Sequence, residues 1–206
     1  MKRNALAFLA VLGAVLPVAG ITAATSVAAK FTAGLLSAPF DEETRIDHAF
    51  SITGGQVKCS SVTFTGVTTG TPSGGLGHES ESWTVTPGYS SCVAFGFSAT
   101  VTNSGCKYTL EADGEMDIFG AGCKLKFLVD NWYAGCEVIM EGQEEYFAVS
   151  YTNDSNHLIV NFYGTDFEAK VTRSWGLCPL TVGSHELIYT GQSTLRAAPT
   201  VIRWDA

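Results

Sequence analysis

The sequence predicts an all-β fold: an antiparallel sandwich or barrel-like meander, stapled by up to three disulfides, after an N-terminal helical signal peptide. Short segments of alternating apolar and polar residues recur between turns rich in Gly, Asn, Asp and Ser. The 22 glycines, 12 phenylalanines and 7 tyrosines are typical of strands and turns. Six cysteines follow an export signal, which predicts disulfides rather than free thiols.

The N-terminus has the pattern of a secretory signal peptide. Lys2 and Arg3 precede an uncharged, mostly apolar run over residues 5–29 that ends in small residues. We expect cleavage after Ala28 or Ala29. A retained anchor is the alternative, because the run is long enough to span a bilayer, but a proline and two glycines interrupt it. We therefore expect a secreted or extracytoplasmic protein with no stable membrane span after processing.

Composition then bounds the rest of the chain. We expect residues 1–29 to be the signal peptide and residues 30–206 to form a single β-rich domain. The leader holds two of the 12 basic residues and none of the 20 acidic ones, which leaves a net charge of −10. This charge argues against a nucleic-acid partner and against binding to anionic lipid through a basic patch.

The first predicted hairpin joins Cys92–Val101 to Cys106–Ala112. Both segments alternate, and the Asn-Ser-Gly sequence between them is a turn signal. A two-residue loop pairs Val101 with Tyr108 and keeps the apolar residues on one face. The cysteines that begin the two segments lie far apart in this register, so we expect no bond between them.

A second predicted hairpin turns at Asp113–Met116, where a glycine fits a type II′ turn. This register places Cys106 opposite Cys123 on the apolar face, and directly opposed strand residues lie within disulfide range. We therefore predict a Cys106–Cys123 bond. Gly120 and Gly122 could mark a bulge that shifts the register.

The remaining alternating segments are also predicted strands. They cover residues 45–52, 57–67, 81–86, 123–129, 136–140, 145–152, 157–163, 167–172 and 184–195, with 157–163 and 167–172 forming a pair around residues 164–166. Residues 68–77 are rich in Gly, Thr and Ser and are predicted to be a loop.

Four cysteines remain after the Cys106–Cys123 bond: Cys59, Cys92, Cys136 and Cys178. Three pairings are possible, because sequence does not decide connectivity. Of these we favour Cys59–Cys92 with Cys136–Cys178. The intervals between the cysteines are too long for zinc ligation, and we expect no metal and no cofactor.

A further set of residues, mainly cysteine and turn positions, lies at 47–50, 57–59, 83–92, 94–96, 99–102, 105–110, 135–136, 143 and 151–153. In these residues the chain resembles a group of secreted actinobacterial proteins to which no activity is assigned. The resemblance implies export and a disulfide-stapled β fold, and it implies no site residues.

Two patterns point weakly to catalysis. Asp47 could orient His48 as the base for a serine nucleophile. No nucleophile signature accompanies the pair, and adjacent strand residues point to opposite faces, so Asp47 cannot easily hold His48. Glu141 with residues 144 and 145 could be read as a glycosidase acid/base pair, but neighbours on one strand do not oppose each other across a cleft.

Two further patterns point to binding. Alternating carboxylates around a glycine could hold Ca²⁺, although a solvated hairpin tip explains them equally well; they are Glu111, Asp113, Glu115 and Asp117. Trp132 and Tyr133 could form a platform for sugars or proteins. We expect instead that the two rings fold back to cap the core.

These observations favour an exported, non-catalytic structural or binding module of the cell envelope or extracellular space. Its partner would be a component of the cell envelope or a glycan. The alternatives are a secreted hydrolase with no recognisable motif and a calcium-stabilised adhesion domain.

Overall fold

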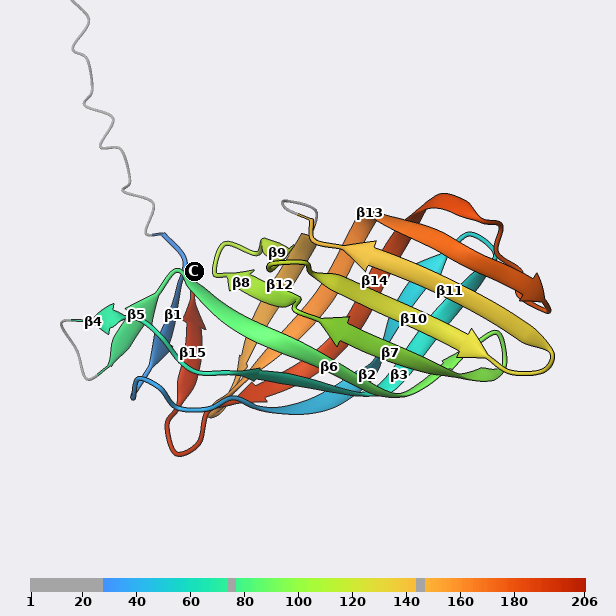
Figure 1. The fold of residues 1–206 in the computed structure, drawn as a ribbon. Coiled ribbons are helices and arrows are strands. Elements are labelled where there is room, and N and C mark those ends of the chain that lie inside the picture. The colour runs from blue at the N-terminus through green and yellow to red at the C-terminus, as the bar shows by residue number, and fades with distance from the viewer. Residues whose placement is uncertain (1–27, 74–76, 144–146) are drawn as a thin grey trace, which may run out of the picture.

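The computed structural model describes residues 28–73, 77–143 and 147–206, and the regular structure in these ranges is all β (Figure 1). Most of the predicted signal peptide, residues 1–27, lies outside the described residues, as does the pair at 144 and 145. Within the described ranges no helix is long and apolar enough to cross a membrane.

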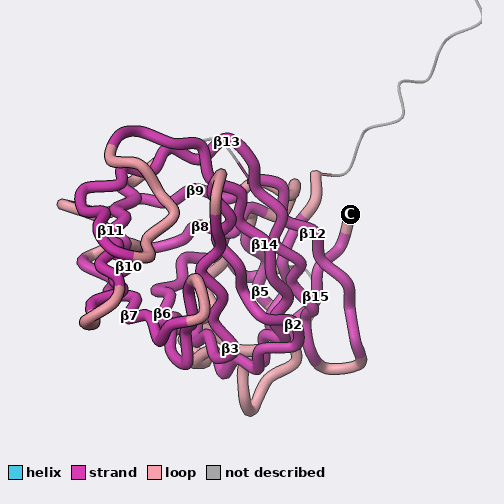
Figure 2. Tube along the Cα trace, turned by 90° about the vertical axis from the view of Figure 1, so that its right-hand side faces the viewer, coloured by secondary structure: helices cyan, strands magenta, loops and turns pink. Residues whose placement is uncertain are grey.

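Eight antiparallel strands of the described chain close into a barrel, so the fold is the barrel-like meander and the sandwich alternative is wrong. Around the barrel each strand pairs with the next barrel strand in chain order, and β14 pairs with β2 to close the ring, as Figure 2 shows along the axis. They are β2 (Asp41–Ile52), β3 (Gly55–Gly66), β6 (Ser82–Ala94), β7 (Phe97–Ser104), β10 (Lys124–Asp130), β11 (Ala134–Glu141), β13 (His157–Gly176) and β14 (Gly183–Arg196).

Shorter strands gather at the end of the barrel that lies on the left in Figure 1. A small separate sheet has the order β15-β1-β5-β4, and three strands extend the barrel sheet: β8 pairs with β6, β9 with β8, and β12 with β13. Their bounds are β1 (Lys30–Ala33), β4 (Thr71–Pro72), β5 (His78–Ser80), β8 (Lys107–Glu111), β9 (Met116–Phe119), β12 (Phe147–Asp154) and β15 (Ile202–Asp205).

Aromatic rings close this end of the barrel. Phe31 of β1 stacks on Trp83 of β6 with ring centroids 4.5 Å apart, and Tyr151 of β12 meets Phe31 edge-on at 4.9 Å. The indole of Trp204 donates a hydrogen bond to the carbonyl of Ala112. The small sheet therefore covers this end with a packed apolar layer.

The first predicted hairpin is wrong. The segment 92–101 is not one strand, because the chain reverses between β6 and β7 at Phe95 and Gly96, whose φ angles are 55° and 83°. Positive φ at both central residues is the geometry of a type I′ turn. As a result Val101 pairs with Phe127 of β10, and Tyr108 pairs with Val85 of β6.

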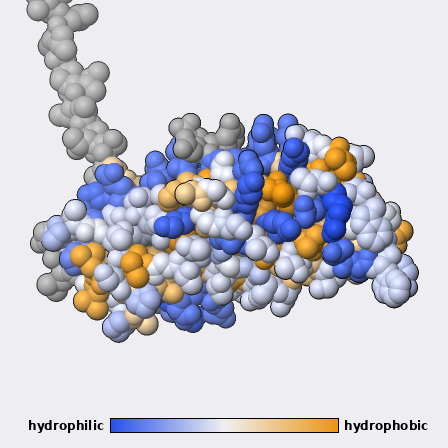
Figure 3. Space-filling view, in the orientation of Figure 1, coloured by the Kyte–Doolittle hydropathy of each residue, from blue (hydrophilic) through white to orange (hydrophobic). Residues whose placement is uncertain are grey.

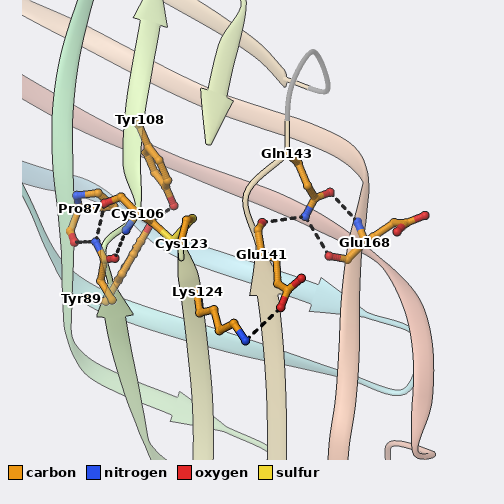
Figure 4. The surroundings of a disulfide bond; sticks show 10 residues. Pro87, Tyr89, Cys106, Tyr108, Cys123, Lys124, Glu141, Gln143 and Glu168 are labelled. Atoms are coloured by element: carbon orange, nitrogen blue, oxygen red, sulfur yellow. Dashed lines mark hydrogen bonds and ion pairs between the residues drawn. A yellow bond between two sulfur atoms is a disulfide. The ribbon is translucent and has the colours of Figure 1, made fainter. Parts of the chain in front are cut away.

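The second hairpin forms, but in a register three residues away from the prediction. Leu110 pairs with Met116, and the turn spans residues 111–115 rather than 113–116. Cys123 still reaches Cys106, because the chain turns back after β9 with the amide of Cys123 bonded to the carbonyl of Gly120 (Figure 4). A Cβ at Gly120 would meet the Gly105 carbonyl oxygen at 2.1 Å, which explains the glycine.

A third correction concerns the predicted pair 157–163 and 167–172. These residues form one long strand, β13, which pairs with β14 along most of its length. The glycine signal at Gly164 marks a bulge rather than a turn, because the register shifts between Gly164 and Phe167.

Three disulfides join the cysteines in the favoured combination: Cys59–Cys92, Cys106–Cys123 and Cys136–Cys178. The first links paired residues of β3 and β6. The second ties β8 to the start of β10, and the third ties β11 to the loop between β13 and β14. They join cysteines that are 33, 17 and 42 residues apart in sequence, and all six cysteines are bonded, which is consistent with an oxidising, extracytoplasmic environment.

Candidate functional site

His48 lies inside the barrel, on β2, and is fully buried. Its neighbour Asp47 points to the outer face, where it pairs with Lys58 at 3.0 Å. The adjacent residues thus take opposite faces, as the strand geometry predicted. Asp47 does not hold His48, so the Asp-His pair expected of a catalytic base is absent from this position.

A glycine makes room for the His48 ring. The register between β14 and β2 shifts on both sides of Gln192, so residues 47 and 48 oppose Gly191 alone. A Cβ at Gly191 would lie 2.5 Å from His48 Nδ1 and 2.6 Å from Cγ. The bulge and the glycine together let the imidazole lie against the backbone of β14.

Both ring nitrogens of His48 are hydrogen-bonded to side chains of β14. Nδ1 lies 2.5 Å from the hydroxyl of Tyr189, and Nε2 lies 2.9 Å from Oγ of Ser193. Ser193 in turn donates to Oε1 of Glu42 at 2.5 Å. We call this group, with the two tyrosines described next, the interior chain: Glu42, Ser193, His48, Tyr189, Tyr89 and Tyr108.

Tyr89 and Tyr108 extend this series of hydrogen-bonded side chains across the barrel interior. The hydroxyl of Tyr89 on β6 lies 3.4 Å from that of Tyr189 and 2.6 Å from that of Tyr108 on β8. Figure 4 shows Tyr89 and Tyr108 meeting beside the Cys106–Cys123 bond. The interior chain therefore connects strands of opposite walls.

When Glu42 is ionised, this acceptor fixes the direction of the interior chain. An ionised Glu42 can only accept, so the Ser193 hydroxyl donates to it and must accept from His48. His48 then carries its proton on Nε2, and its Nδ1 accepts from Tyr189. In this state Ser193 cannot give its proton to His48, which removes the step that a serine nucleophile requires.

Burial shifts the protonation of the interior chain. It lowers the pKa of the His48 imidazole to about 4, against the nearby negative charge of Asp47. It raises the pKa of the Glu42 carboxyl to about 7, while hydrogen bonds from Ser193 and Thr44 act in the opposite direction. The second oxygen of Glu42 is buried with no hydrogen-bond partner in the described structure. Burial also raises the pKa values of the three tyrosines.

Aromatic rings fill the interior around His48. Phe50 stacks on Tyr189 at 4.5 Å, and Phe127 lies 4.6 Å from Phe50. Phe162 lies 5.2 Å from the His48 ring. An eight-stranded barrel is just wide enough to be filled by side chains, and the described side chains around His48 form a packed core.

The predicted calcium hairpin does not gather its carboxylates. No three His, Cys, Asp or Glu side chains of the described residues come together as a metal site. Instead the Tyr151 hydroxyl donates to the Glu111 carbonyl, and Asp113 accepts the amide of Glu115 within the turn. Partial burial and nearby carboxylates raise the pKa of Glu111.

The outer wall carries an open groove of about 510 Å³ across β10, β11, β13 and β14. Gln143 spans its edge, accepting the Glu168 amide and donating to the Glu168 carbonyl (Figure 4). Lys124 and Glu141 pair within the groove at 3.2 Å. The two lysines and two glutamates that line the groove balance, so its formal net charge is zero.

The prediction for Trp132 and Tyr133 is wrong. The rings do not fold back over the core: Trp132 is 89% exposed and Tyr133 is 67% exposed. They lie in the turn between β10 and β11, at the end of the barrel opposite the small sheet (Figure 1). Sequence reasoning found the residues but not their exposure.

Comparison with protein-family models, curated proteins and solved structures found no match to this chain. The function is therefore argued from the interior chain and from the surface.

Proposed function

We propose that the protein is an exported, non-catalytic binding module of the cell envelope or extracellular space. The observation that carries this proposal is the closed interior, where His48, Ser193 and Glu42 bond to one another among packed rings. A catalytic group must reach a substrate, and a buried, mutually bonded His and Ser do not. The three disulfides support an extracytoplasmic location.

The rigid barrel then serves as a support for surface residues. A module of this kind binds through surface turns that a stable scaffold holds in place, because turns can carry exposed binding residues whereas the strands are constrained by packing. The resemblance to secreted actinobacterial proteins supports export, and it does not indicate which partner the protein binds.

Labelling with a fluorophosphonate, a reagent for activated serines, tests the non-catalytic part. We expect the oxidised protein to remain unlabelled next to an active serine hydrolase as positive control. Labelling that disappears in Ser193→Ala and in His48→Ala would overturn the proposal.

Export is tested separately by expressing the full chain. We expect protein in the medium that begins at residue 29 or 30, with six cysteines that react with an alkylating agent only after reduction. Retention in the cytoplasm with free thiols would contradict this part of the proposal.

A further inference from the structure

The β10–β11 turn and the β13–β14 loop form one rigid structure at the end of the barrel opposite the small sheet. The amide of Leu177 donates to the Tyr133 carbonyl at 2.8 Å, and the Cys136–Cys178 bond joins the two segments. Asn131 Oδ1 accepts the amides of Tyr133 and Ala134 at 2.9 and 3.1 Å. We call these two segments, residues 131–136 and 174–183, the barrel tip.

The barrel tip exposes large apolar side chains. Besides Trp132 and Tyr133, Leu177 and Val182 are each 64% exposed, and Trp175 is 43% exposed. In Figure 3 the extreme right-hand end of the molecule is pale to orange, while strongly hydrophilic residues lie along the barrel wall. Isolated exposed apolar residues need no explanation, but several on two joined segments indicate an interaction surface.

The barrel tip also lacks charge. Residues 131–136 and 174–183 contain no Asp, Glu, Lys, Arg or His. The rest of the processed chain carries 20 acidic and 10 basic residues. Within the tip a charged partner would find no complementary group, and the bordering Asp130 and Arg173 are paired with each other at 3.2 Å.

Two polar side chains of the tip are already used within it. Recognition of a sugar needs convergent hydrogen-bonding side chains beside the aromatic ring. Here Asn131 uses its oxygen within the turn, and Ser174 donates to the Leu180 carbonyl. Leu177 and Val182 add aliphatic surface that hydroxyl groups would cover poorly. These features favour an apolar partner with a polar boundary.

We propose that the barrel tip docks onto the interfacial layer of a lipid bilayer. Trp and Tyr are favoured at the headgroup level, and exposed aliphatic side chains reach the boundary of the acyl chains. The disulfide holds both segments in place, so little conformational entropy is lost on docking. The proposal rests on the proposed function only in requiring an exported protein, and it involves no membrane span.

Charge sets the preferred lipid. The processed chain has a net charge of −10 and the tip has no basic cluster, so anionic headgroups repel the barrel as it approaches. We therefore expect stronger binding to zwitterionic phosphatidylcholine vesicles than to vesicles containing half phosphatidylglycerol. This order is the reverse of that expected for a polybasic membrane-binding protein.

The test is sedimentation of the processed, oxidised protein with phosphatidylcholine vesicles, followed by tryptophan fluorescence. We expect binding with a blue shift of the emission. The variant W132A/Y133A should bind at least about tenfold more weakly, because the exposed indole and phenol supply most of the apolar area. Leu177→Asp keeps both rings and should also weaken binding, since it places a charge at the interface.

Two variants on the barrel wall are matched controls. Tyr163→Ala and Ile46→Ala remove side chains that are 59% and 58% exposed but lie on β13 and β2 away from the tip. Both should bind vesicles like the unchanged protein. Circular dichroism of each variant confirms that it is folded before its binding is compared.

Several results would overturn the proposal: no binding to phosphatidylcholine, equal loss in the control variants, or stronger binding to the anionic vesicles. If the protein binds insoluble glycans through the tip and does not bind vesicles, the partner of the tip is a sugar and not a lipid. If the protein self-associates through the tip in sedimentation velocity and does not bind vesicles, the partner of the tip is a second copy of the chain. None of these outcomes bears on the fluorophosphonate test, so the two proposals fail independently.

Discussion

Replacing Glu42 with Gln should make the protein more sensitive to acid. In the folded state the pKa of Glu42 is raised from 4.5 to about 7, and that of His48 is lowered from 6.5 to about 4. Between pH 4.5 and 6.5 the folded protein therefore holds a proton on Glu42 and none on His48. The unfolded chain holds one on His48 and none on Glu42.

The two groups thus bind the same number of protons in both states across this window, and their effects on stability oppose each other. The buried His48 is neutral in the folded state, so the folded state loses stability as the pH falls from about 6.5 to about 4. At about 1.4 kcal/mol per pH unit, the full loss is about 3 kcal/mol. Protonation of Glu42, by contrast, stabilises the folded state as the pH falls over the same range. Because Glu42 is only partly buried, solvent reduces its share to about 1–2 kcal/mol.

Urea denaturation at pH 7 and pH 4.5 measures the difference. Glu42→Gln keeps an oxygen that accepts from Ser193 but cannot titrate, so only the His48 effect remains. We expect the variant to lose about 1–2 kcal/mol more than the unchanged protein between these pH values. Glu43→Gln, an exposed carboxylate in an ion pair with Arg196, is the control and should parallel the unchanged protein. Identical pH profiles for the Glu42→Gln variant and the unchanged protein would refute the reasoning.

Three further outcomes are expected. Gly191→Ala should lower the unfolding free energy, measured by urea denaturation, by about 2–4 kcal/mol, because the new Cβ would displace the His48 ring from both hydrogen-bond partners. In a protein that already carries His48→Ala, the same change should cost under about 1 kcal/mol. Trp132→Ala should change stability by less than about 0.5 kcal/mol, and a larger loss would mean that the ring packs on the barrel. Peptide mapping of the oxidised protein should recover Cys106 linked to Cys123, and a peptide that joins Cys106 to another cysteine would contradict the fold.

Alternation predicted the strands well because each barrel strand has one face toward a filled interior. Turn chemistry predicted the connections less well. The reversal at Phe95 and Gly96 lacks the usual Asn-Gly or Asp-Gly pair, and a phenylalanine at positive φ is uncommon. The structure supplies its reason: the Phe95 ring lies over Gly55 of β3, where a Cβ would meet it at 1.8 Å. Such a long-range contact leaves no local signal.

The interior chain could not be predicted from single segments for a similar reason. Its members come from β2, β6, β8 and β14, so only the closed barrel brings them together. One local signal was present: Tyr189, Gly191 and Ser193 alternate on β14 with the smallest residue in the middle, which is a place for a ring from another strand. The Cys106–Cys123 bond was predicted from a register that is three residues off, and the two cysteines meet because the chain turns back at Gly120. No local pattern distinguished the three possible pairings of the other four cysteines.

The interior chain also explains why β2 and β14 pair in only one way. Their register shifts on both sides of Gln192, and a shifted ladder loses backbone hydrogen bonds that must be offset elsewhere. His48 offsets this loss by bonding to Tyr189 on one side of Gly191 and to Ser193 on the other. A slip of one residue would turn His48 toward the outer face and remove one buried hydrogen-bond partner from each of the two hydroxyls. The bonds of His48 therefore select the register that closes the barrel, and a closed barrel is what holds the tip in place.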